Sequence, residues 1–129
     1  MPYQHTETLD RSVIASFREG AVEGAPDIAS LLIEQFLQEA AVQADRLRDA
    51  RQCGDAAELK SAAHNLKGSS TTMGAKRLGV ICTALEAHAA GPSSAVDASA
   101  LIAELLAELD RELVNVSAAL LAECEVSRT

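Results

Sequence analysis

The sequence predicts an all-α protein: an antiparallel four-helix bundle (up-down-up-down) with an additional short N-terminal helix. First, 48% of the 129 residues are hydrophobic but only 2% are aromatic, and alanine and leucine dominate, which favours helix. Second, apolar residues recur at three- and four-residue spacing in four long segments. Third, no segment shows the alternation of a strand. The length indicates one domain with a single core.

The N-terminal part of the chain is expected to contain a short helix. Residues 1–8 are polar and are predicted to be flexible. A helix over about 9–19 follows, with Gly20 ending it and residues 24–26 as a connection. Its apolar side consists of Leu9, Val13, Ile14 and Phe17. The next helix is expected to begin near Asp27, because the proline before it is tolerated in a first turn.

Glycines and an aspartate separate the bundle helices. These helices are expected at about 27–51, 55–73, 75–89 and 95–122, within a single domain over residues 9–122. Gly54 closes the first of them and Asp55 opens the second, as a C-cap followed by an N-cap. Gly74 separates the second from the third, and the turn cluster 91–94 precedes the fourth. Residues 123–129 are predicted to be a flexible C-terminus.

Each bundle helix has a row of residues expected in the core. The rows are Leu32, Phe36, Ala40, Gln43 and Leu47; Leu59, Ala63, Leu66, Ser70 and Met73; Leu78, Ile81, Cys82 and Leu85; and Ile102, Leu105, Leu109, Leu113, Val116 and Leu120. Ile28, Leu31, Ile33 and Leu37 widen the apolar surface of the first bundle helix. The short N-terminal helix is expected to cover them, although a partly exposed patch for a partner is compatible with this.

The charge of the chain is unevenly distributed. The net charge is −8, which argues against nucleic acid or an anionic membrane as the partner. Residues 59–85 contain no acid and carry +4, from Lys60, Lys67, Lys76 and Arg77, so the remainder carries −12. This basic window suits an acidic partner surface or a phosphoryl group. The alternative is a solvated face with no role.

The three cysteines, Cys53, Cys82 and Cys124, have no metal-ligand spacing. No signal peptide precedes the polar N-terminus, and no apolar run is long enough to span a bilayer. The sequence therefore predicts a cytoplasmic protein with reduced thiols.

His64 lies one step, about 100°, from the apolar row of its helix. Its neighbours at helical spacing include Lys60, Lys67 and Gly68. A glycine inside a helix costs roughly 1 kcal/mol relative to alanine, so a helix that only packs has no use for Gly68. The missing side chain leaves room above the imidazole, and Lys67 supplies a cation that can reach a phosphoryl oxygen. This pattern favours phosphoryl chemistry at His64.

The run His64-Asn65-Leu66-Lys67-Gly68-Ser69-Ser70, followed by Met73-Gly74-Ala75, Leu78, Cys82 and Leu85-Glu86, resembles the histidine-containing phosphotransfer (HPt) domain of multistep phosphorelays. The resemblance extends from about Ile28 to the end of the last helix. It implies that His64 carries the phosphoryl group. It also implies that Lys67 holds the charge and that Gly68 keeps the ring accessible.

The resemblance implies a phosphocarrier rather than an enzyme. His64 would accept a phosphoryl group from the receiver domain of a hybrid histidine kinase and pass it to a response regulator. No cofactor of its own is expected, and Mg²⁺ would belong to the partner receiver. Lys60 is a second, weaker candidate for phosphoryl pairing, and Ser69 or Ser70 is expected to bond the ring or to brace the helix. A monomer is expected.

Other classes fit the sequence less well. A di-iron bundle enzyme needs a glutamate three residues before a histidine, and none of the three histidines has one. A complete histidine kinase needs a nucleotide-binding domain, for which 129 residues leave no room. The main alternative is a non-catalytic adaptor or inhibitor that binds a kinase or receiver, in which His64 is dispensable. A phosphoacceptor module of a larger kinase fits less well.

Overall fold

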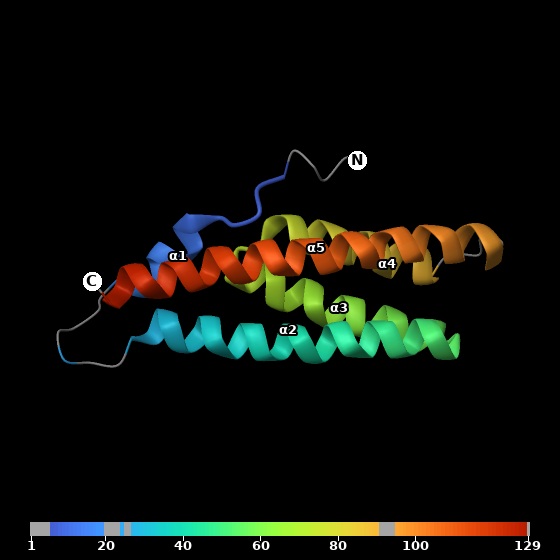
Figure 1. Ribbon diagram of the computed structural model, residues 1–129, viewed down its shortest axis with the longest axis horizontal. Coiled ribbons are helices and arrows are strands. Elements are labelled where there is room, and N and C mark those ends of the chain that lie inside the picture. Colours follow the sequence, from blue (N-terminus) through green and yellow to red (C-terminus); the bar gives the residue numbers. More distant parts are fainter. Residues whose placement is uncertain (1–5, 20–23, 25–26, 91–94, 129) are drawn as a thin grey trace.

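The computed structural model contains five helices and describes all residues except 1–5, 20–23, 25–26, 91–94 and 129 (Figure 1). The helices are α1 (Arg11–Arg18), α2 (Ile28–Cys53), α3 (Ala56–Met73), α4 (Lys76–Ala90) and α5 (Ala95–Arg128). None of the described residues forms a strand. The prediction of an all-α bundle with a short N-terminal helix is confirmed.

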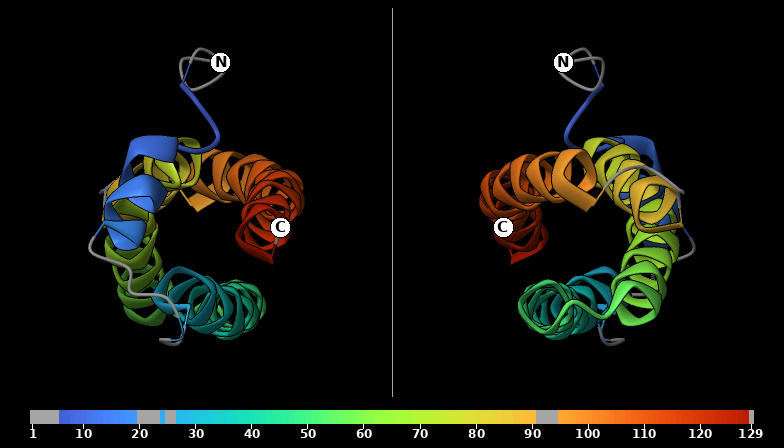
Figure 2. Two further views of the ribbon diagram at one scale, coloured as in Figure 1. Left: turned by 90° about the vertical axis from the view of Figure 1, so that its left-hand side faces the viewer. Right: turned by 90° about the vertical axis from the view of Figure 1, so that its right-hand side faces the viewer.

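The four long helices run alternately in opposite directions and surround one core (Figures 1 and 2). Helix α3 packs between α2 and α4, and α5 closes the ring by contacting α4 and α2. Helix α1 lies against α2 and α3 at the end of the bundle where α5 finishes. The predicted turn over 91–94, the predicted helix end at Gly20 and most of the connection over 24–26 lie outside the described residues.

Side-chain and glycine caps define the helix ends. Asp10, Asp27 and Asp55 each accept a hydrogen bond from a backbone N–H in the first turn of α1, α2 and α3. Gly54 ends α2 with φ 71° and Gly74 ends α3 with φ 82°, so both occupy the left-handed region that only glycine adopts readily. The turns between α2, α3 and α4 are therefore fixed by local sequence.

The core consists of the apolar faces of all five helices. The predicted rows of α3 and α4 are buried throughout. On α2 the prediction is wrong at one position, because Ile33 is fully buried and Leu32 is only partly so. The two residues are adjacent and point about 100° apart around α2, so a small rotation of the helix about its own axis decides which of them faces the core. Ile28 and Leu31 remain more than half exposed, so α1 covers only part of that surface.

The C-terminal end of the chain differs from the expectation. The last helix does not end near residue 122 and give way to a flexible C-terminus, but continues to Arg128. The physical reason is that Cys124 is buried and the nearly buried Glu123 carboxylate binds two arginines of α1. Arg11 Nη2 lies 2.7 Å from Glu123 Oε1, and Arg18 Nη1 lies 3.1 Å from Glu123 Oε2. These ion pairs fasten α1 to the end of α5.

The N-terminal segment is also more tightly attached than expected. The first described residues, 6–10, lie against α4 and the turn before it, and we call them the N-terminal strap. The backbone N–H of Asp10 donates to the carbonyl oxygen of Gly74 at 2.7 Å. The backbone N–H of Arg77 donates to the carbonyl oxygen of Glu7 at 3.0 Å. The prediction of a loose segment over 1–8 is therefore wrong for residues 6–8, while 1–5 lie outside the described residues.

Although α2 and α5 exceed 18 residues, neither they nor the shorter described helices combine that length with enough apolar character to cross a membrane.

Candidate functional site

His64 lies in the middle of α3, on the edge of that helix next to α4. The residues before and after it in the apolar row, Ala63 and Leu66, are fully buried. The His64 side chain itself is 63% exposed. The ring therefore lies at the surface of the bundle, as its position about 100° from the core row of α3 predicts.

A carboxylate on α4 contacts both the His64 ring and Lys67. Glu86 Oε1 lies 3.1 Å from His64 Nδ1, and Glu86 Oε2 lies 3.0 Å from Lys67 Nζ. The Glu86 side chain is 20% exposed and that of Lys67 is 33% exposed. Lys67 follows His64 by one helical turn, so the two side chains of α3 reach the same partner on α4. Histidine, glutamate and lysine thus form one connected cluster.

The charges in this cluster determine which ring nitrogen carries the proton. The Lys67 ammonium, followed by the His64 ring, holds the pKa of the Glu86 carboxyl below its ordinary value of 4.5. Glu86 is therefore ionised at neutral pH and only accepts hydrogen bonds. His64 Nδ1 must then be the donor, which leaves the lone pair of the neutral imidazole on Nε2. The ring is arranged to act as a nucleophile through Nε2.

Gly68 leaves open space next to this cluster. A Cβ atom added at Gly68 would have no atom within 4 Å other than those of its own helix and chain neighbours. Packing therefore does not require a glycine at this position, although a glycine weakens the helix. The open space is consistent with the proposed access to the ring.

The serines after Gly68 do not contact the ring. The Ser69 hydroxyl donates to Glu39 Oε1 on α2 at 3.1 Å and lies 3.2 Å from the carbonyl oxygen of Asn65. Ser70 is fully buried, and its hydroxyl has no hydrogen-bond partner among the described residues. Both serines therefore belong to the helix and its packing. Lys60 is exposed one turn before His64 and takes no part in the cluster.

Cys82 lies beneath the cluster, one turn before Glu86 on α4. It is fully buried, and burial raises the pKa of its thiol to about 12. A thiol nucleophile must be ionised, so Cys82 does not compete with His64 for this role. Its place in the apolar row is that of a small core residue, as predicted.

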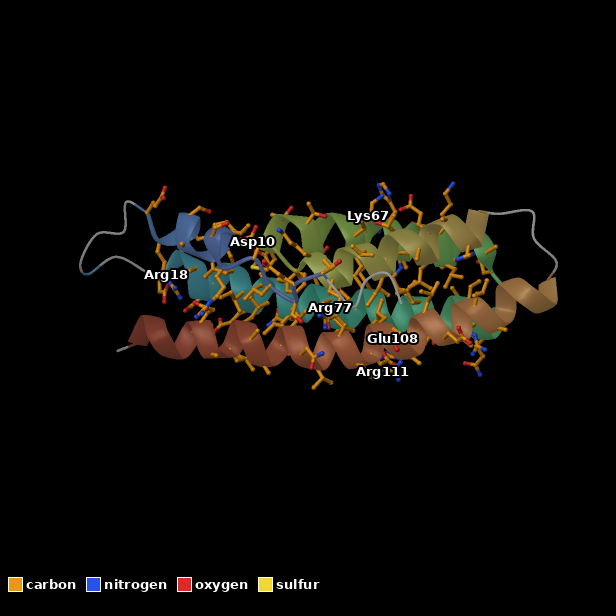
Figure 3. All side chains as sticks on the ribbon, turned by 90° about the horizontal axis from the view of Figure 1, so that it is seen from above. Asp10, Arg18, Lys67, Arg77, Glu108 and Arg111 are labelled. Atoms are coloured by element: carbon orange, nitrogen blue, oxygen red, sulfur yellow. The ribbon has the colours of Figure 1, made fainter. Side chains whose placement is uncertain are left out.

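A groove of about 630 Å³ begins at Lys67 and Gly68 and runs along α3 and α4. The N-terminal strap and the first turn of α1 line its other side. Figure 3 shows Lys67 on the α3 side of the bundle, away from Glu108 and Arg111 on α5. The His64 ring therefore lies beside a concave surface.

The part of the chain that the structure describes contains no group of three or more histidine, cysteine or carboxylate side chains placed to hold a metal ion. Glu86 is the only carboxylate within hydrogen-bond distance of His64 among these residues.

Sequence reasoning did not assign a role to Glu86. It is the first acid after the basic window of residues 59–85, and in the sequence it stands out only within the run that resembles the HPt domain. Its contact with His64 depends on the packing of α4 against α3, which places a residue 22 positions away beside the ring. The weak available signal was its position one turn after Cys82 in the predicted core row.

An exposed histidine on a helical bundle, flanked by a lysine and an open glycine, is the arrangement typical of a histidine phosphotransfer domain. The Hpt domain family matches residues 31–119, and the chain belongs to this family. A structure similar to this chain is that of histidine-containing phosphotransfer protein B (HptB) from Pseudomonas aeruginosa PAO1. It shares 29% sequence identity with a TM-score of 0.74, and the match covers 92% of this chain and 95% of that chain. None of the curated proteins matches this sequence significantly.

Proposed function

We propose that this chain is a phosphorelay intermediate. His64 accepts a phosphoryl group from the aspartyl phosphate of a receiver domain, such as that of a hybrid histidine kinase, and passes it to the aspartate of a response regulator. The observation that supports this best is the contact of 3.1 Å between His64 Nδ1 and the ionised Glu86, which leaves Nε2 as the nucleophile on an exposed ring. Membership of the Hpt family supports the same conclusion.

The transfer step uses the His64 ring in both directions. Nε2 attacks the phosphorus atom while the bond from phosphorus to the aspartate oxygen breaks, and the aspartate carboxylate leaves with the electron pair. The proton on Nδ1 stays in place, so the ring gains positive charge next to the Glu86 carboxylate, which stabilises it. Transfer to the second receiver reverses these steps, and the aspartate oxygen of that receiver is the new nucleophile.

Lys67 is the residue proposed to neutralise the phosphoryl group. In the unphosphorylated chain its ammonium lies 3.0 Å from Glu86 Oε2, in a partly exposed ion pair. Such pairs contribute little to stability, so exchanging the carboxylate for phosphoryl oxygens costs little. Lys60 is exposed one turn before His64 and is a weaker second candidate. Ser69 and Ser70 support α3 rather than the phosphoryl group.

The remaining chemistry is assigned to the partner. Phosphoryl transfer depends on positioning and charge neutralisation, and the receiver domain is proposed to supply Mg²⁺ and its own carboxylates. This chain is then a phosphocarrier that needs no cofactor of its own. We propose that it acts as a monomer in the cytoplasm, where receiver domains meet their kinases.

Transfer from a purified receiver domain tests this proposal. A receiver from the same cell is phosphorylated with radiolabelled acetyl phosphate, which releases acetate, is freed of excess donor and is mixed with the protein. A second receiver is then added. We expect the label to move to the protein and then to the second receiver. On the protein the label should be lost in acid and retained in base, as expected for phosphohistidine.

The non-catalytic adaptor predicts a different result from the same mixture. An adaptor binds the receiver measurably, but no label reaches it at any time. Binding without label for every receiver of the cell would therefore overturn the relay and support the adaptor. Acid-stable label would instead indicate a phosphorylated hydroxyl group.

Two substitutions at Gly68 separate stability from access. Gly68→Ala is expected to raise the free energy of unfolding by about 0.5–1 kcal/mol, because alanine favours helix and meets no neighbour there. Gly68→Gln, also a good helix former, is expected to slow phosphoryl uptake roughly 10²-fold, because its side chain occupies the open space beside the ring. Urea unfolding and single-turnover uptake measure the two effects. Equal uptake by both variants would show that the open space has no role in access.

A further inference from the structure

The groove next to His64 has walls of different origin. Helices α3 and α4 form one side and the floor, whereas Thr6 and Asp10 of the strap and Val13 of α1 form the other side. Among the described residues that line it, the charged ones are Asp10, Lys67 and Lys76. Among the described lining residues, those outside the helices are Thr6 and Asp10 of the strap and Gly74 in the turn between α3 and α4.

The floor of the groove is accessible. Beyond Gly68, it contains Gly79 of α4, where an added Cβ atom would approach only the Thr71 hydroxyl, at 3.8 Å. Val80 is 39% exposed on the same surface. A partner that enters the groove therefore contacts helix backbone and small side chains, and its fit depends on where the opposite wall lies.

Arg77 holds this wall in place. Its Nε donates to the carbonyl oxygen of Thr6 at 2.8 Å, and its backbone N–H donates to that of Glu7 at 3.0 Å. On the other side, Arg77 Nη1 lies 3.5 Å from Glu112 Oε1 of α5. Figure 3 shows Arg77 between the strap and α5. The Arg77 side chain of α4 therefore connects the strap to α5.

Glu112 restricts the position of the Arg77 guanidinium. It is only 2% exposed, and the Asn115 amide donates to the same oxygen, Oε1, at 3.1 Å. A buried carboxylate needs a cation or hydrogen-bond donors, so Arg77 is held toward it. The planar guanidinium can then present Nε to the strap while Nη1 faces Glu112, which a lysine cannot do.

We propose that the N-terminal strap is one wall of the surface on which the receiver domain docks, and that Arg77 is the positioning residue that holds this wall. The inference rests on the proposed function. The groove shares Lys67 and Gly68 with the His64 site, so a receiver that delivers a phosphoryl group to His64 must cover it. The part of the groove formed by α3 and α4 also lies within the basic window of residues 59–85, on a chain whose remainder carries −12. The lysines of this window attract the acidic edge of a receiver active site.

Two variants displace the strap from opposite ends. Arg77→Lys keeps a cation near Glu112 but loses the Nε donor to Thr6, and Gly74→Ala places a methyl group 2.9 Å from the carbonyl oxygen of Asp10. Both are expected to raise the KM for the phosphorylated receiver about fivefold or more. The rate of His64 phosphorylation by phosphoramidate, a small donor that needs no docking surface, is expected to stay at the wild-type value.

Matched controls use an arginine and a glycine away from the groove. Arg48→Lys alters an exposed arginine that bridges Asp45 and Asp110, and Gly54→Ala alters the corresponding cap of α2. Both are expected to keep the KM within about twofold of wild type. A wild-type KM for Arg77→Lys and Gly74→Ala, with a receiver that does transfer, would overturn the inference and leave the phosphocarrier function intact.

Hydrogen exchange on the wild-type chain tests the same inference without a substitution. Binding of an unphosphorylated receiver is expected to slow exchange of the strap amides, residues 6–10, together with those of Val80 and Thr83 in the groove. Unchanged exchange in the strap, with protection around His64, would show that the receiver docks elsewhere. Absence of phosphoryl uptake by the wild type would instead overturn the proposed function itself.

Discussion

A His64→Gln protein is expected to accept no phosphoryl group from any receiver domain, while it keeps the fold and the receiver affinity of the wild type. Glutamine has no nucleophilic nitrogen, so the whole chemical step is lost rather than slowed. The native side chain is 63% exposed, and Glu86 is its only hydrogen-bond partner among the described residues. The free energy of unfolding is therefore expected to change by no more than about 0.5 kcal/mol.

His88→Gln provides the matched control. His88 lies half-buried in the last turn of α4, two positions after Glu86, which places it about 200° around the helix from that carboxylate. Its substitution is expected to leave phosphoryl uptake at the wild-type rate. Label on the His64→Gln protein would place the acceptor elsewhere. Full biological activity of that variant in the cell would support an adaptor, for which the histidine is dispensable.

The helices could be predicted because the signals that determine them are local. The apolar rows of α3 and α4 repeat at helical spacing, and the glycines at 54 and 74 end helices through their own conformation. The exposure of His64 followed from the same spacing, since the angle between successive residues is fixed in a helix. None of these inferences required knowledge of how one helix packs against another.

The contacts between elements could not be predicted, because they depend on how the helices pack against one another. Glu86 reaches His64 only because α4 packs against α3 with a particular rotation, and no local pattern encodes that rotation. Glu123 was assigned to a flexible terminus because its partners, the arginines of α1, lie more than 100 positions earlier. The attachment of the strap through Arg77 was missed in the same way, since its acceptors are backbone carbonyls without a sequence signal.

Substituting Gly74 by alanine is expected to destabilise the protein far more than the same change at Gly54. Both glycines end a helix in the left-handed region, with φ 82° and 71°, so alanine costs about 1–2 kcal/mol at either position. The surroundings differ. A Cβ atom at Gly74 would lie 2.9 Å from the backbone oxygen of Asp10 and 3.0 Å from Val13 Cβ, whereas at Gly54 it would meet nothing within 4 Å.

The difference between the two alanine variants measures how firmly the strap is held. Neither the Asp10 backbone, fixed by its 2.7 Å hydrogen bond to Gly74, nor the Val13 side chain can move without disturbing the strap or α1. We therefore expect Gly74→Ala to lower the free energy of unfolding by about 1–3 kcal/mol more than Gly54→Ala does, as at other overpacked sites. Urea unfolding of the two variants provides the comparison. Equal losses of unfolding free energy in the two variants would mean that the strap can be displaced at no free-energy cost. A wall so easily displaced would not determine how a receiver docks.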